Sequence, residues 1–478
     1  MTAGSPDPGV SARYRQAEKE IGARRPERSI EPTLERIADL AMLLGDPQRA
    51  YPVIHITGTN GKTSVARMID TLLRARGLRT GRFTSPHLAS MRERICVDGE
   101  PLSQERFVEA YADVLPQVRM VDERHRSDLS FFEVLTGMAY AAFADAPVDV
   151  AVVEVGLGGR WDATNIADGS VAVVTPISVD HTQYLGDTIA AIATEKSGII
   201  KRGAVAVLGQ QPVEAAEILL RRCADEGASV AREGIEFGVL QRDVAVGGQR
   251  LALRGLRGVY ENLFLPLFGA HQAGNAVCAL ASVEAFAGMG AAGAVGAGVG
   301  PVDLGSGSLG SNGHGSGNAL DPDLVDEAFR EMTSPGRLEV VRRSPTVLVD
   351  AAHNPAGMAA TVAALEESFT FTAVIGVIAV MADKDVTAIL GEVEPVLSEV
   401  VVTRNSDVRS LGPAELAEQA GEIFGPERVH VAARIDDAID TAVRLADEAA
   451  PDGPPGGTGV LITGSVVTAG DARLLLTR

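Results

Sequence analysis

The sequence predicts an α/β protein whose mostly parallel sheets are covered by helices on both faces. Short apolar runs rich in β-branched residues recur along the chain, and amphipathic stretches of helical period separate them. A glycine-containing loop follows the first of these runs. Near-continuous apolar strands that alternate with helices are typical of parallel sheets buried on both faces. We expect two domains, a larger one over residues 1–334 and a smaller α/β domain over residues 335–478.

Eight apolar runs are interpreted as buried strands. They cover residues 52–57, 148–155, 171–175, 204–208, 346–350, 373–380, 400–403 and 460–463. A helix should follow the first strand, because five apolar residues share one helical face and Gly77 ends the stripe. The five are Val65, Met68, Ile69, Leu72 and Leu73. Another helix should begin near Asp321.

Residues 288–320 interrupt this pattern with a tract rich in glycine and serine. Such a tract buries too little apolar surface to offset the entropy lost on ordering. We therefore expect a flexible insert near the C-terminal edge of the first domain.

Composition excludes several classes of partner. The chain has 478 residues and a net charge of −20, and this field repels the phosphates of a nucleic acid. The three cysteines (Cys96, Cys223 and Cys278) are far apart, which fits a reducing compartment. The longest apolar run is too short for a membrane span, and the first residues do not form a signal peptide. We expect a cytoplasmic monomer without nucleic-acid or membrane partners.

The strongest motif is Gly58–Ser64 (GTNGKTS), which follows a predicted strand and opens a predicted helix. Its glycines would let the backbone N–H groups face phosphates, at the positive end of a helix. Lys62 would bring a full positive charge to the outer phosphates, and Thr63 could donate a hydroxyl. The alternative is an ordinary strand–turn–helix junction. We favour nucleotide binding.

A second motif combines residues 83–88 (FTSPHL) with residues 91–95 (MRERI). Pro86 fixes a turn, and Ser85 and Arg94 are donors beside it. Alone, this segment is more typical of a surface loop than of a functional site.

A third motif is residues 153–165 (VEVGLGGRWDATN). Glu154 ends a buried strand, at the edge of the sheet where open α/β folds bind ligands. A carboxylate there requires a cation, and Mg²⁺ prefers one or two carboxylates together with phosphate oxygens. The alternative is a buried ion pair with Arg160.

A fourth motif begins at Asp180 and His181, which we place at the end of another predicted strand, on the same edge as Glu154. That position favours a metal role for His181 as much as a structural one. Lys196, on the next predicted helix, would by itself be interpreted as a solvated charge.

The last group of polar residues lies on both sides of the glycine-rich tract. Asn275 precedes the tract in HQAGN, and Arg337 and His353 follow it in PGRLE and DAAHNP. Asp350 ends a strand and could accept a hydrogen bond from a ribose hydroxyl, and Lys384 follows a further strand. Each is a weak signal alone, but their repeated position after strands supports a site.

Taken in chain order, these motifs resemble the folate-specific branch of the Mur ligase superfamily. The resemblance runs from about Arg28 to Gly470 and rests on seven segments. They are GTNGKTS, FTSPHL with RERI, VEVGLGGRWDATN, DHTQYLG with EKSGI, HQAGNA, PGRLE and DAAHNP. It implies a P-loop ATP-binding domain followed by a smaller Rossmann-like domain. The implied reaction is ATP-dependent phosphorylation of a substrate carboxylate, followed by attack of the amino group of L-glutamate on the acyl phosphate.

The resemblance also implies substrates and cofactors. The acceptor would be dihydropteroate, through its carboxylate, or tetrahydrofolate, through its γ-carboxylate. ATP would be the co-substrate and two Mg²⁺ ions the cofactors, with a monovalent cation as a further candidate.

Site residues follow from the resemblance by position. Those for ATP are Thr59, Asn60, Gly61, Lys62, Thr63, Asn275, Arg337, Asp350 and His353. Those for the metal are Ser85, Glu154 and His181, and Lys196 matches a lysine that the family carries as a carbamate. The catalytic set is then Lys62, Glu154, His181 and Lys196. The pterin set is Ile30, Glu31, Pro32, Arg94, Ser130, Phe131, Phe132, Glu133, Trp161, Asp162 and Ala163, and Lys384 and Ser465 are candidates for the glutamate carboxylates.

Two rival functions are less consistent with the sequence. A peptidoglycan precursor ligase would need a nucleotide-sugar domain, and the segment before Gly58 is too short for one. A nucleotide switch without chemistry would not need two polar strand ends and a second α/β domain. It would also need a guanine-reading N-K-x-D sequence, which is absent.

Overall fold

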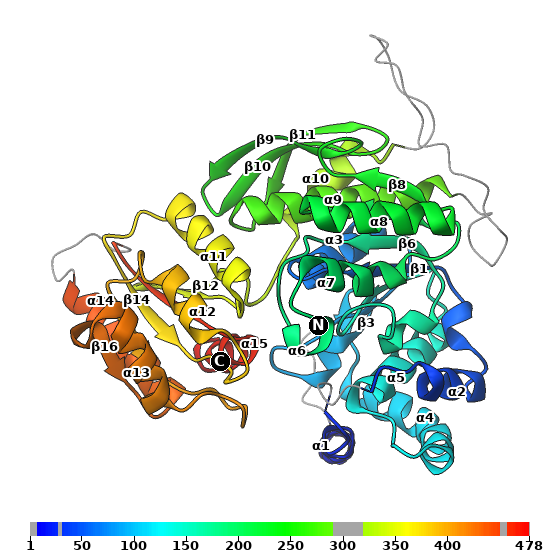
Figure 1. Cartoon of the computed structure of the whole chain (residues 1–478), viewed down its shortest axis with the longest axis horizontal. Helices are drawn as coiled ribbons and strands as arrows, with labels where there is room; N and C mark the ends of the chain where they lie inside the picture. Colours follow the sequence, from blue (N-terminus) through cyan, green and yellow to red (C-terminus); the bar gives the residue numbers. More distant parts are fainter. Residues whose placement is uncertain (1–6, 27–30, 290–318, 450–456, 478) are drawn as a thin grey trace, which may run out of the picture.

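The computed structural model describes residues 7–26, 31–289, 319–449 and 457–477. Its first part is built on an eight-stranded sheet in the order β4-β3-β2-β5-β1-β6-β7-β8 (Figure 1). The strands are β1 (Val53–Thr57), β2 (Thr80–Phe83), β3 (Ile95–Val97), β4 (Glu100–Pro101), β5 (Val150–Glu154), β6 (Gly169–Val174), β7 (Val205–Leu208) and β8 (Ser229–Arg232). All pairs are parallel except those that β3 makes with β2 and β4.

Helices cover both faces of this sheet, as the apolar strands predict. Alternate residues of β1 show the reason: Ile54 and Ile56 face α3, α9 and α10, whereas Val53 faces α4 and α5. The helices are α1 (Pro8–Gly22), α2 (Glu35–Leu43), α3 (Lys62–Ala75), α4 (Gln104–Arg124), α5 (Phe131–Asp145), α6 (Thr182–Leu185), α7 (Ile189–Lys196), α8 (Val213–Glu226), α9 (Ala270–Gly288) and α10 (Pro322–Arg330). The five apolar residues of the predicted helical stripe lie on α3, and all five are fully buried.

A three-stranded antiparallel sheet, which the sequence analysis did not predict, packs against α9 and α10. Its strands are β9 (Gly238–Ala245), β10 (Gly248–Arg254) and β11 (Val259–Leu265). One face of this sheet is solvated, so polar residues interrupt its apolar residues. No continuous apolar run marks these strands.

The second part contains a six-stranded sheet in the order β12-β13-β17-β14-β15-β16. Its strands are β12 (Glu339–Arg343), β13 (Thr346–Val349), β14 (Ala373–Ile378), β15 (Glu399–Val402), β16 (Val429–Val431) and β17 (Thr458–Thr463). Only β12 is antiparallel to its neighbour. The helices α11 (Pro355–Ser368), α12 (Val386–Val393) and α13 (Pro413–Phe424) cover one face, and α14 (Ile435–Ala449) and α15 (Val466–Leu476) cover the other.

Short 3₁₀ helices complete the described chain. They are Pro47–Arg49, Met91–Arg94, Ala163–Ile166, Ser197–Ile199 and Pro426–Arg428. The expected flexible insert falls largely on residues 290–318, which lie outside the described residues, as does Ile30. The helix expected near Asp321 is α10, and the Asp321 carboxylate caps its first turn.

Candidate active site

The loop between β1 and α3 has the geometry of a phosphate-binding loop. Gly61 has a φ of +87°, and a Cβ added there would lie 2.4 Å from the side-chain oxygen of Asn275 on α9. Only glycine fits this position, because the backbone is left-handed and the neighbouring helix leaves no room. Lys62 begins α3 and folds back, so that its Nζ donates to the carbonyl oxygens of Gly58 at 3.1 Å and Thr59 at 3.0 Å.

Glu154 ends β5 beside this loop and is almost fully buried. Its two carboxylate oxygens each accept from the Thr63 hydroxyl at 3.0 Å, and one also accepts from the Ser85 backbone N–H at 3.3 Å. Burial raises the pKa of Glu154, and the nearby Lys62 ammonium opposes that rise. The alternative ion pair with Arg160 is not formed in the part of the chain that the structure describes. The carboxylate therefore faces the phosphate loop.

The sequence predicts that Asp180 and His181 end a strand, but neither residue lies at the end of β6. The strand ends at Val174, and residues 175–179 lead from it to His181, whose φ of +53° lies in the left-handed region. Pro176 lies in this segment and cannot donate to a sheet ladder. The segment nevertheless carries both side chains to the edge of the sheet where Glu154 lies, because they line the same cavity.

Asp180 connects the two parts of the molecule. It accepts from Lys384 Nζ at 2.6 Å and from Asn354 Nδ2 at 2.9 Å, both on the C-terminal part. Burial would raise the pKa of Asp180, but His181 and His353, which become charged only at low pH, and the Lys384 ammonium hold it well below its usual range. Asn354 also donates to Asn60 of the phosphate loop at 3.2 Å.

Both histidines beside Asp180 are held in the neutral form. Burial lowers the pKa of His181 to about 3 and, with the help of Lys384, that of His353 to about 4. A neutral imidazole nitrogen carries a lone pair that can bind a metal ion. His353 Nδ1 lies 3.0 Å from the Ala351 carbonyl oxygen, so its other ring nitrogen is the one directed toward Asp180, at 3.8 Å.

Lys196 is not a solvated charge, since it is 3% exposed at the end of α7. Its Nζ donates to the Gly58 carbonyl oxygen at 2.7 Å. Burial, reinforced by the Lys62 charge, lowers the pKa of Lys196 to about 7. A large fraction of this amine is therefore neutral, and hence nucleophilic, near neutral pH.

One cavity of about 590 Å³ collects every residue predicted for ATP and for the metal. The lining includes Thr59, Asn60, Gly61, Lys62, Thr63, Ser85, Glu154, His181, Asn275, Arg337, Asp350 and His353. Lys196 does not line this cavity. It lines a small neighbouring cavity together with Gly58, Lys62 and His181. Segments more than 290 residues apart in the sequence thus form one site.

A second cavity of about 410 Å³ opens beside the first. Of the residues predicted for the pterin and the glutamate, it is lined by Glu31, Arg94, Ser130, Phe132, Glu133, Trp161, Asp162, Ala163, Lys384 and Ser465. The two cavities share the lining residues Ser85, Pro86, Gly156, His181, His353 and Val466. A ligand in one cavity can therefore reach a ligand in the other at Ser85 and His181.

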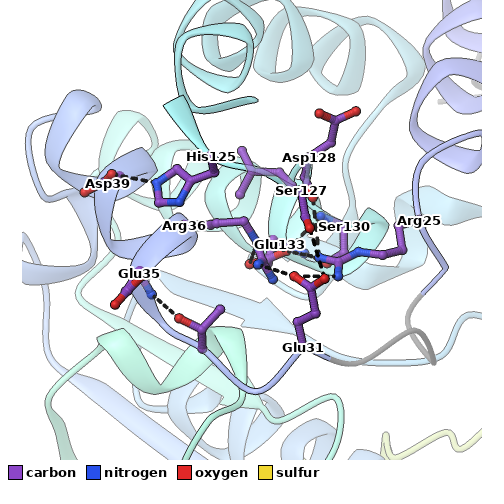
Figure 2. A network of polar contacts seen from close by, with 12 residues as sticks. Arg25, Glu31, Glu35, Arg36, Asp39, His125, Ser127, Asp128, Ser130 and Glu133 are labelled. Carbon is purple, nitrogen blue, oxygen red and sulfur yellow. Dashed lines mark hydrogen bonds and ion pairs between the residues drawn. The ribbon is translucent and has the colours of Figure 1, made fainter. Parts of the chain in front are cut away.

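A network of charged side chains forms one wall of this second cavity (Figure 2). Arg36 on α2 donates to Glu133 Oε1 at 3.1 Å and to Glu31 Oε2 at 2.7 Å. Arg25 contacts the same two carboxylates, at 3.0 Å from Glu31 and 3.7 Å from Glu133. The Ser130 N–H donates to Glu133 at 2.8 Å and completes a capping box at the start of α5. The network ties residues 31–36 to α5.

Some predicted contacts differ in the structure. Pro32 and Phe131 do not line the second cavity, where Thr33 and Arg36 are found instead. Phe131 lies under the Arg94 guanidinium, 4.9 Å from ring centroid to carbon.

Three predicted ligand residues already have protein partners. The Asp350 carboxylate accepts from Leu338 N, Ala352 N and the Thr361 hydroxyl, which leaves about one of its four acceptor positions. The Ser465 hydroxyl caps α15 and contacts Asn405. Lys384 is paired with Asp180, as described above.

Three important residues were not predicted as site residues: Asp180, Asn354 and Arg36. Asn354 lies inside the DAAHNP motif and Asp180 begins DHTQYLG, so membership of a motif was the available signal. Arg36 had no such signal, because its partners Glu31 and Glu133 meet it only in the tertiary structure.

The oxygen-rich surroundings of Glu154 fit a hard divalent cation. Across the described residues, no three His, Cys, Asp or Glu side chains converge as a complete metal cage. One carboxylate with nearby hydroxyl groups, next to a phosphate loop, is instead the arrangement that suits Mg²⁺, which takes its remaining ligands from phosphate and water. The buried Glu154 carboxylate supplies the negative charge for such an ion.

Comparison with known families identifies the class of protein. Residues 56–283 match the Mur ligase middle domain, and residues 336–466 match the Mur ligase glutamate ligase domain. The three sheets described above fall largely within these two ranges. The fold is therefore that of a Mur ligase.

Individual relatives narrow this class. The dihydrofolate synthase/folylpolyglutamate synthase of Mycobacterium tuberculosis is 51% identical, over 99% of this chain and 96% of its own length. The folylpolyglutamate synthase of Lacticaseibacillus casei is 31% identical, over 92% of this chain and 94% of its own length. The crystal structure of the M. tuberculosis folylpolyglutamate synthase with ADP and AMPPCP has a TM-score of 0.88, covering 98% of this chain and 99% of that one. This chain belongs to the dihydrofolate synthase/folylpolyglutamate synthase family.

The resemblance and the fold class predicted from the sequence are confirmed. Searched over the part of the chain that the structure describes, the helices include none with the length and apolar character to cross a membrane.

Proposed function

We propose that this chain uses ATP to ligate L-glutamate to the carboxylate of dihydropteroate, to the γ-carboxylate of a reduced folate, or to both. The products are dihydrofolate or folylpolyglutamate, with ADP and phosphate. The observation that carries this proposal is the junction of two cavities at Ser85 and His181. A phosphate donor and a carboxylate acceptor need such a junction to react.

The nucleotide occupies the larger cavity, with its phosphates on the loop between β1 and α3. The loop amides and Lys62 offset phosphate charge, and Thr63 donates a hydroxyl. Ser85, Glu154 and His181 are the residues that would hold Mg²⁺. Bound there, the ion would neutralise phosphate charge and polarise the terminal phosphoryl group. A second Mg²⁺ and a monovalent cation remain part of the proposal, as expected from the family.

The acceptor carboxylate occupies the smaller cavity and must approach the terminal phosphate. At about 4 Å and an effective dielectric constant near 20, repulsion between two unit charges is about 4 kcal/mol. Lys62 and the loop amides reduce this repulsion at the junction. The carboxylate oxygen attacks the γ-phosphorus, the bond to the β-phosphate oxygen breaks, and ADP leaves. The resulting acyl phosphate has a good leaving group, which a free carboxylate lacks.

The pterin end of the acceptor lies deeper in the same cavity, between Phe132, Trp161 and the charged network of Figure 2. Burial raises the pKa of Asp162 to about 6, while hydrogen bonds from Thr164 and Leu157 oppose the rise. Aromatic walls with a few polar groups suit a flat heterocycle with several donors. Arg94 supplies a positive charge near the benzoate side.

L-glutamate approaches from the C-terminal part, where Lys384 and Ser465 line the same cavity. Its neutral amine attacks the acyl carbon, phosphate leaves, and an amide forms. Water would hydrolyse the acyl phosphate, so the two parts of the chain must stay closed during this step. The contacts of Asp180 and Asn60 with Lys384 and Asn354 support this closure.

Lys196 acts as a carbamate in this proposal. Its neutral amine combines with CO₂ and loses a proton, which converts a cation into an anion. Near Lys62 and His181 that anion would favour binding of a second metal ion and would orient the ligands around it.

The proposal also includes the domain boundary, the cellular location and the oligomeric state. We place the domain boundary between residues 334 and 335, ahead of the first strand of the six-stranded sheet. All three cysteines are unpaired, which supports a cytoplasmic location. We expect the enzyme to act as a monomer.

A phosphate-release assay tests this function. The purified protein is incubated with ATP, Mg²⁺ and L-glutamate, and in parallel with dihydropteroate, tetrahydrofolate or a peptidoglycan precursor. We expect phosphate release with one or both pterin substrates, matched by formation of the glutamylated product. Release with the peptidoglycan precursor alone would reject the proposal.

A further inference from the structure

A carboxylate lies at the end of the nucleotide cavity farthest from the acceptor cavity. Glu233 directly follows β8, the edge strand of the eight-stranded sheet, and lines this cavity with Gln210, Val239, Gly274 and Cys278. None of the motifs above includes Glu233.

The order of the strands fixes how far Glu233 lies from the phosphate loop. From β1, which carries that loop, the sheet continues through β6 and β7 to β8. Three strand spacings of about 4.8 Å each give roughly 14 Å along the carboxyl edge of the sheet. This distance is comparable to the separation between the terminal phosphate and the base of an extended nucleoside triphosphate. The base should therefore lie beside β7 and β8.

The Glu233 carboxylate has acceptor capacity to spare. Its Oε2 accepts from the Gln210 N–H at 2.8 Å, whereas Oε1 accepts no hydrogen bond from any residue that the structure describes. Oε1 faces Gly274 on α9 and lies 3.6 Å from the position that a Cβ atom on Gly274 would occupy. Over the same described residues, no Lys or Arg forms an ion pair with Glu233. Burial raises the pKa of Glu233, and the hydrogen bond from the Gln210 N–H opposes that rise. The group is a half-buried carboxyl with a free acceptor oxygen and no paired cation among the described residues.

Purine bases differ in the group that they carry at position 6, which such an acceptor could contact. Adenine carries a 6-amino group that donates, whereas guanine and hypoxanthine carry a 6-oxo group that accepts. A carboxylate attracts the first and repels the second. We propose that Glu233 binds the 6-amino group of the base and so selects ATP over 6-oxo nucleotides. This inference rests on the proposed ATP site.

Gly274 leaves room for the base beside Glu233, because it has no side chain. A side chain there would fill the space between Glu233 and the start of α9, where the base must enter. The alternative is a purely structural role, in which Glu233 only fixes the position of Gln210 through the one hydrogen bond described above. That structural role would affect all nucleotides equally, so comparing nucleotides separates the two.

The experiment compares three nucleotides in three proteins. ATP, purine riboside triphosphate (which lacks the 6-amino group) and inosine triphosphate are assayed by kcat/KM for glutamate ligation. The proteins are the wild type, Glu233→Ala and Glu233→Gln. For the wild type we expect ATP to exceed purine riboside triphosphate by about 10- to 100-fold, the value of one hydrogen bond to a charged group. In Glu233→Ala this ratio should fall to near one.

The Glu233→Gln variant gives an independent readout. Its amide can donate to a 6-oxo group, so kcat/KM for inosine triphosphate should rise relative to ATP. Glu236→Ala is the matched control, because Glu236 is three residues away and pairs with Arg232 outside the cavity. It should keep the wild-type ratio.

The outcomes distinguish this inference from the function on which it rests. If the wild type does not turn over ATP with any pterin substrate, the proposed function fails. If the wild type uses ATP and purine riboside triphosphate equally well, or Glu233→Ala keeps the full preference, the inference on Glu233 is overturned. An equal use of both nucleotides by the wild type overturns the inference even if a variant fails to fold, and Glu233→Gln then serves as the second variant for assigning a preference to this residue.

Discussion

Lys62 is the residue through which the phosphate loop acts on the nucleotide. Its ammonium donates to the Gly58 and Thr59 carbonyl oxygens, so the side chain is held over the loop. Burial lowers the pKa of Lys62, which the Glu154 charge opposes. A charge held in a buried position is strongly felt by an incoming anion.

We predict that Lys62→Ala lowers ATP-dependent ligation on the order of 10²–10³-fold or more, because it removes a donor to the transferring phosphoryl group. Phosphate release measures this, and circular dichroism checks the fold. Lys19→Ala, at an exposed position on α1, is the matched control. Near-normal turnover of Lys62→Ala would remove this residue from the phosphate site.

Lys196 gives a prediction about pH and CO₂. Only the neutral amine is carbamylated, and its pKa is lowered to about 7. At constant dissolved CO₂, the neutral fraction and the rate of reactivation should rise roughly tenfold per pH unit below this pKa and level off above it. Recovery of ligation after CO₂ is stripped from the protein measures the rate across a pH series.

The nearby Lys201 offers the control for this experiment. Its Nζ donates to the Asn165 carbonyl oxygen, and burial lowers its pKa as well, yet it lines neither main cavity. Lys201→Ala should keep the CO₂ dependence, whereas Lys196→Ala should lose both activity and dependence. Full activity of the wild type without CO₂ would contradict the carbamate.

At the scale of elements, the connection between α2 and the start of α5 rests on Arg36. Both Arg36 and Glu133 are 5% exposed, so neither charge has water to replace a lost partner. Breaking a buried ion pair by removing one member costs more than the pair contributes to stability, because the other charge stays buried.

We predict that Arg36→Met lowers the free energy of unfolding by about 3 kcal/mol, near the low end for a buried pair, because Arg25 and Ser130 still contact Glu133. The single tryptophan, Trp161, allows urea unfolding to be followed by fluorescence. Arg36→Met with Glu133→Gln should recover part of the loss. Arg49→Met removes an exposed pair with Asp46 and should cost less than about 1 kcal/mol. Equal losses for Arg36→Met and Arg49→Met would contradict the role of the network.

At the scale of the whole molecule, polar contacts join the two parts across the active site. Lys384 and Asn354 meet Asp180 and Asn60 there, and a further ion pair joins Arg242 on β9 to Glu367 on α11. Figure 1 shows the six-stranded sheet lying to one side of the eight-stranded sheet, with α11 toward it. Apolar side chains also meet across this boundary, because Phe268 packs against Phe369 with ring centroids 4.9 Å apart and Leu88 packs against the core of the C-terminal part.

We predict that Lys384→Met loosens this closure and admits water. Ligation should fall about 10-fold or more, since misplacement of reacting groups costs this much or more. Phosphate release should fall less, so that phosphate formed per amide rises above its wild-type ratio. The assay measures both products from the same reaction.

Two comparisons sharpen the Lys384 prediction. Asp180→Asn should raise the same ratio if the ion pair is what matters, whereas a contact of Lys384 with glutamate alone would raise only the KM for glutamate. Arg434→Gln, at a fully exposed pair on the C-terminal part, should leave the ratio unchanged. An unchanged ratio in both Lys384→Met and Asp180→Asn would contradict the closure.

The net charge of −20 is a property of the whole molecule that affects how it binds its ligands. The proposed ligands are anions, so an acidic protein must hold its positive groups locally. Lys62, Arg94, Arg337 and Lys384 all line one or both cavities, where they act at short range. The rest of the surface repels polyanions that lack such a fitted site.

The sequence by itself determined eight apolar strands of the two larger sheets (β1, β5, β6, β7, β13, β14, β15 and β17), the phosphate loop and the identity of the family. A buried parallel strand is a continuous apolar run, and a loop that must bind phosphate needs glycine and lysine at fixed spacing, so both are local properties of the chain. The antiparallel sheet of β9–β11 lacked a continuous run and was missed for the same reason.

Only the tertiary structure decided which side chains meet. The pairing of Asp180 with Lys384, the position of Arg36 between Glu31 and Glu133, and the distance of Glu233 from the phosphate loop all depend on strand order and on how two sheets are placed together. Residues far apart in the sequence are brought together by burial of the helices between them, and no local pattern records that outcome. The pKa of Lys196 follows the same logic, because it reflects the depth at which the folded chain buries the amine.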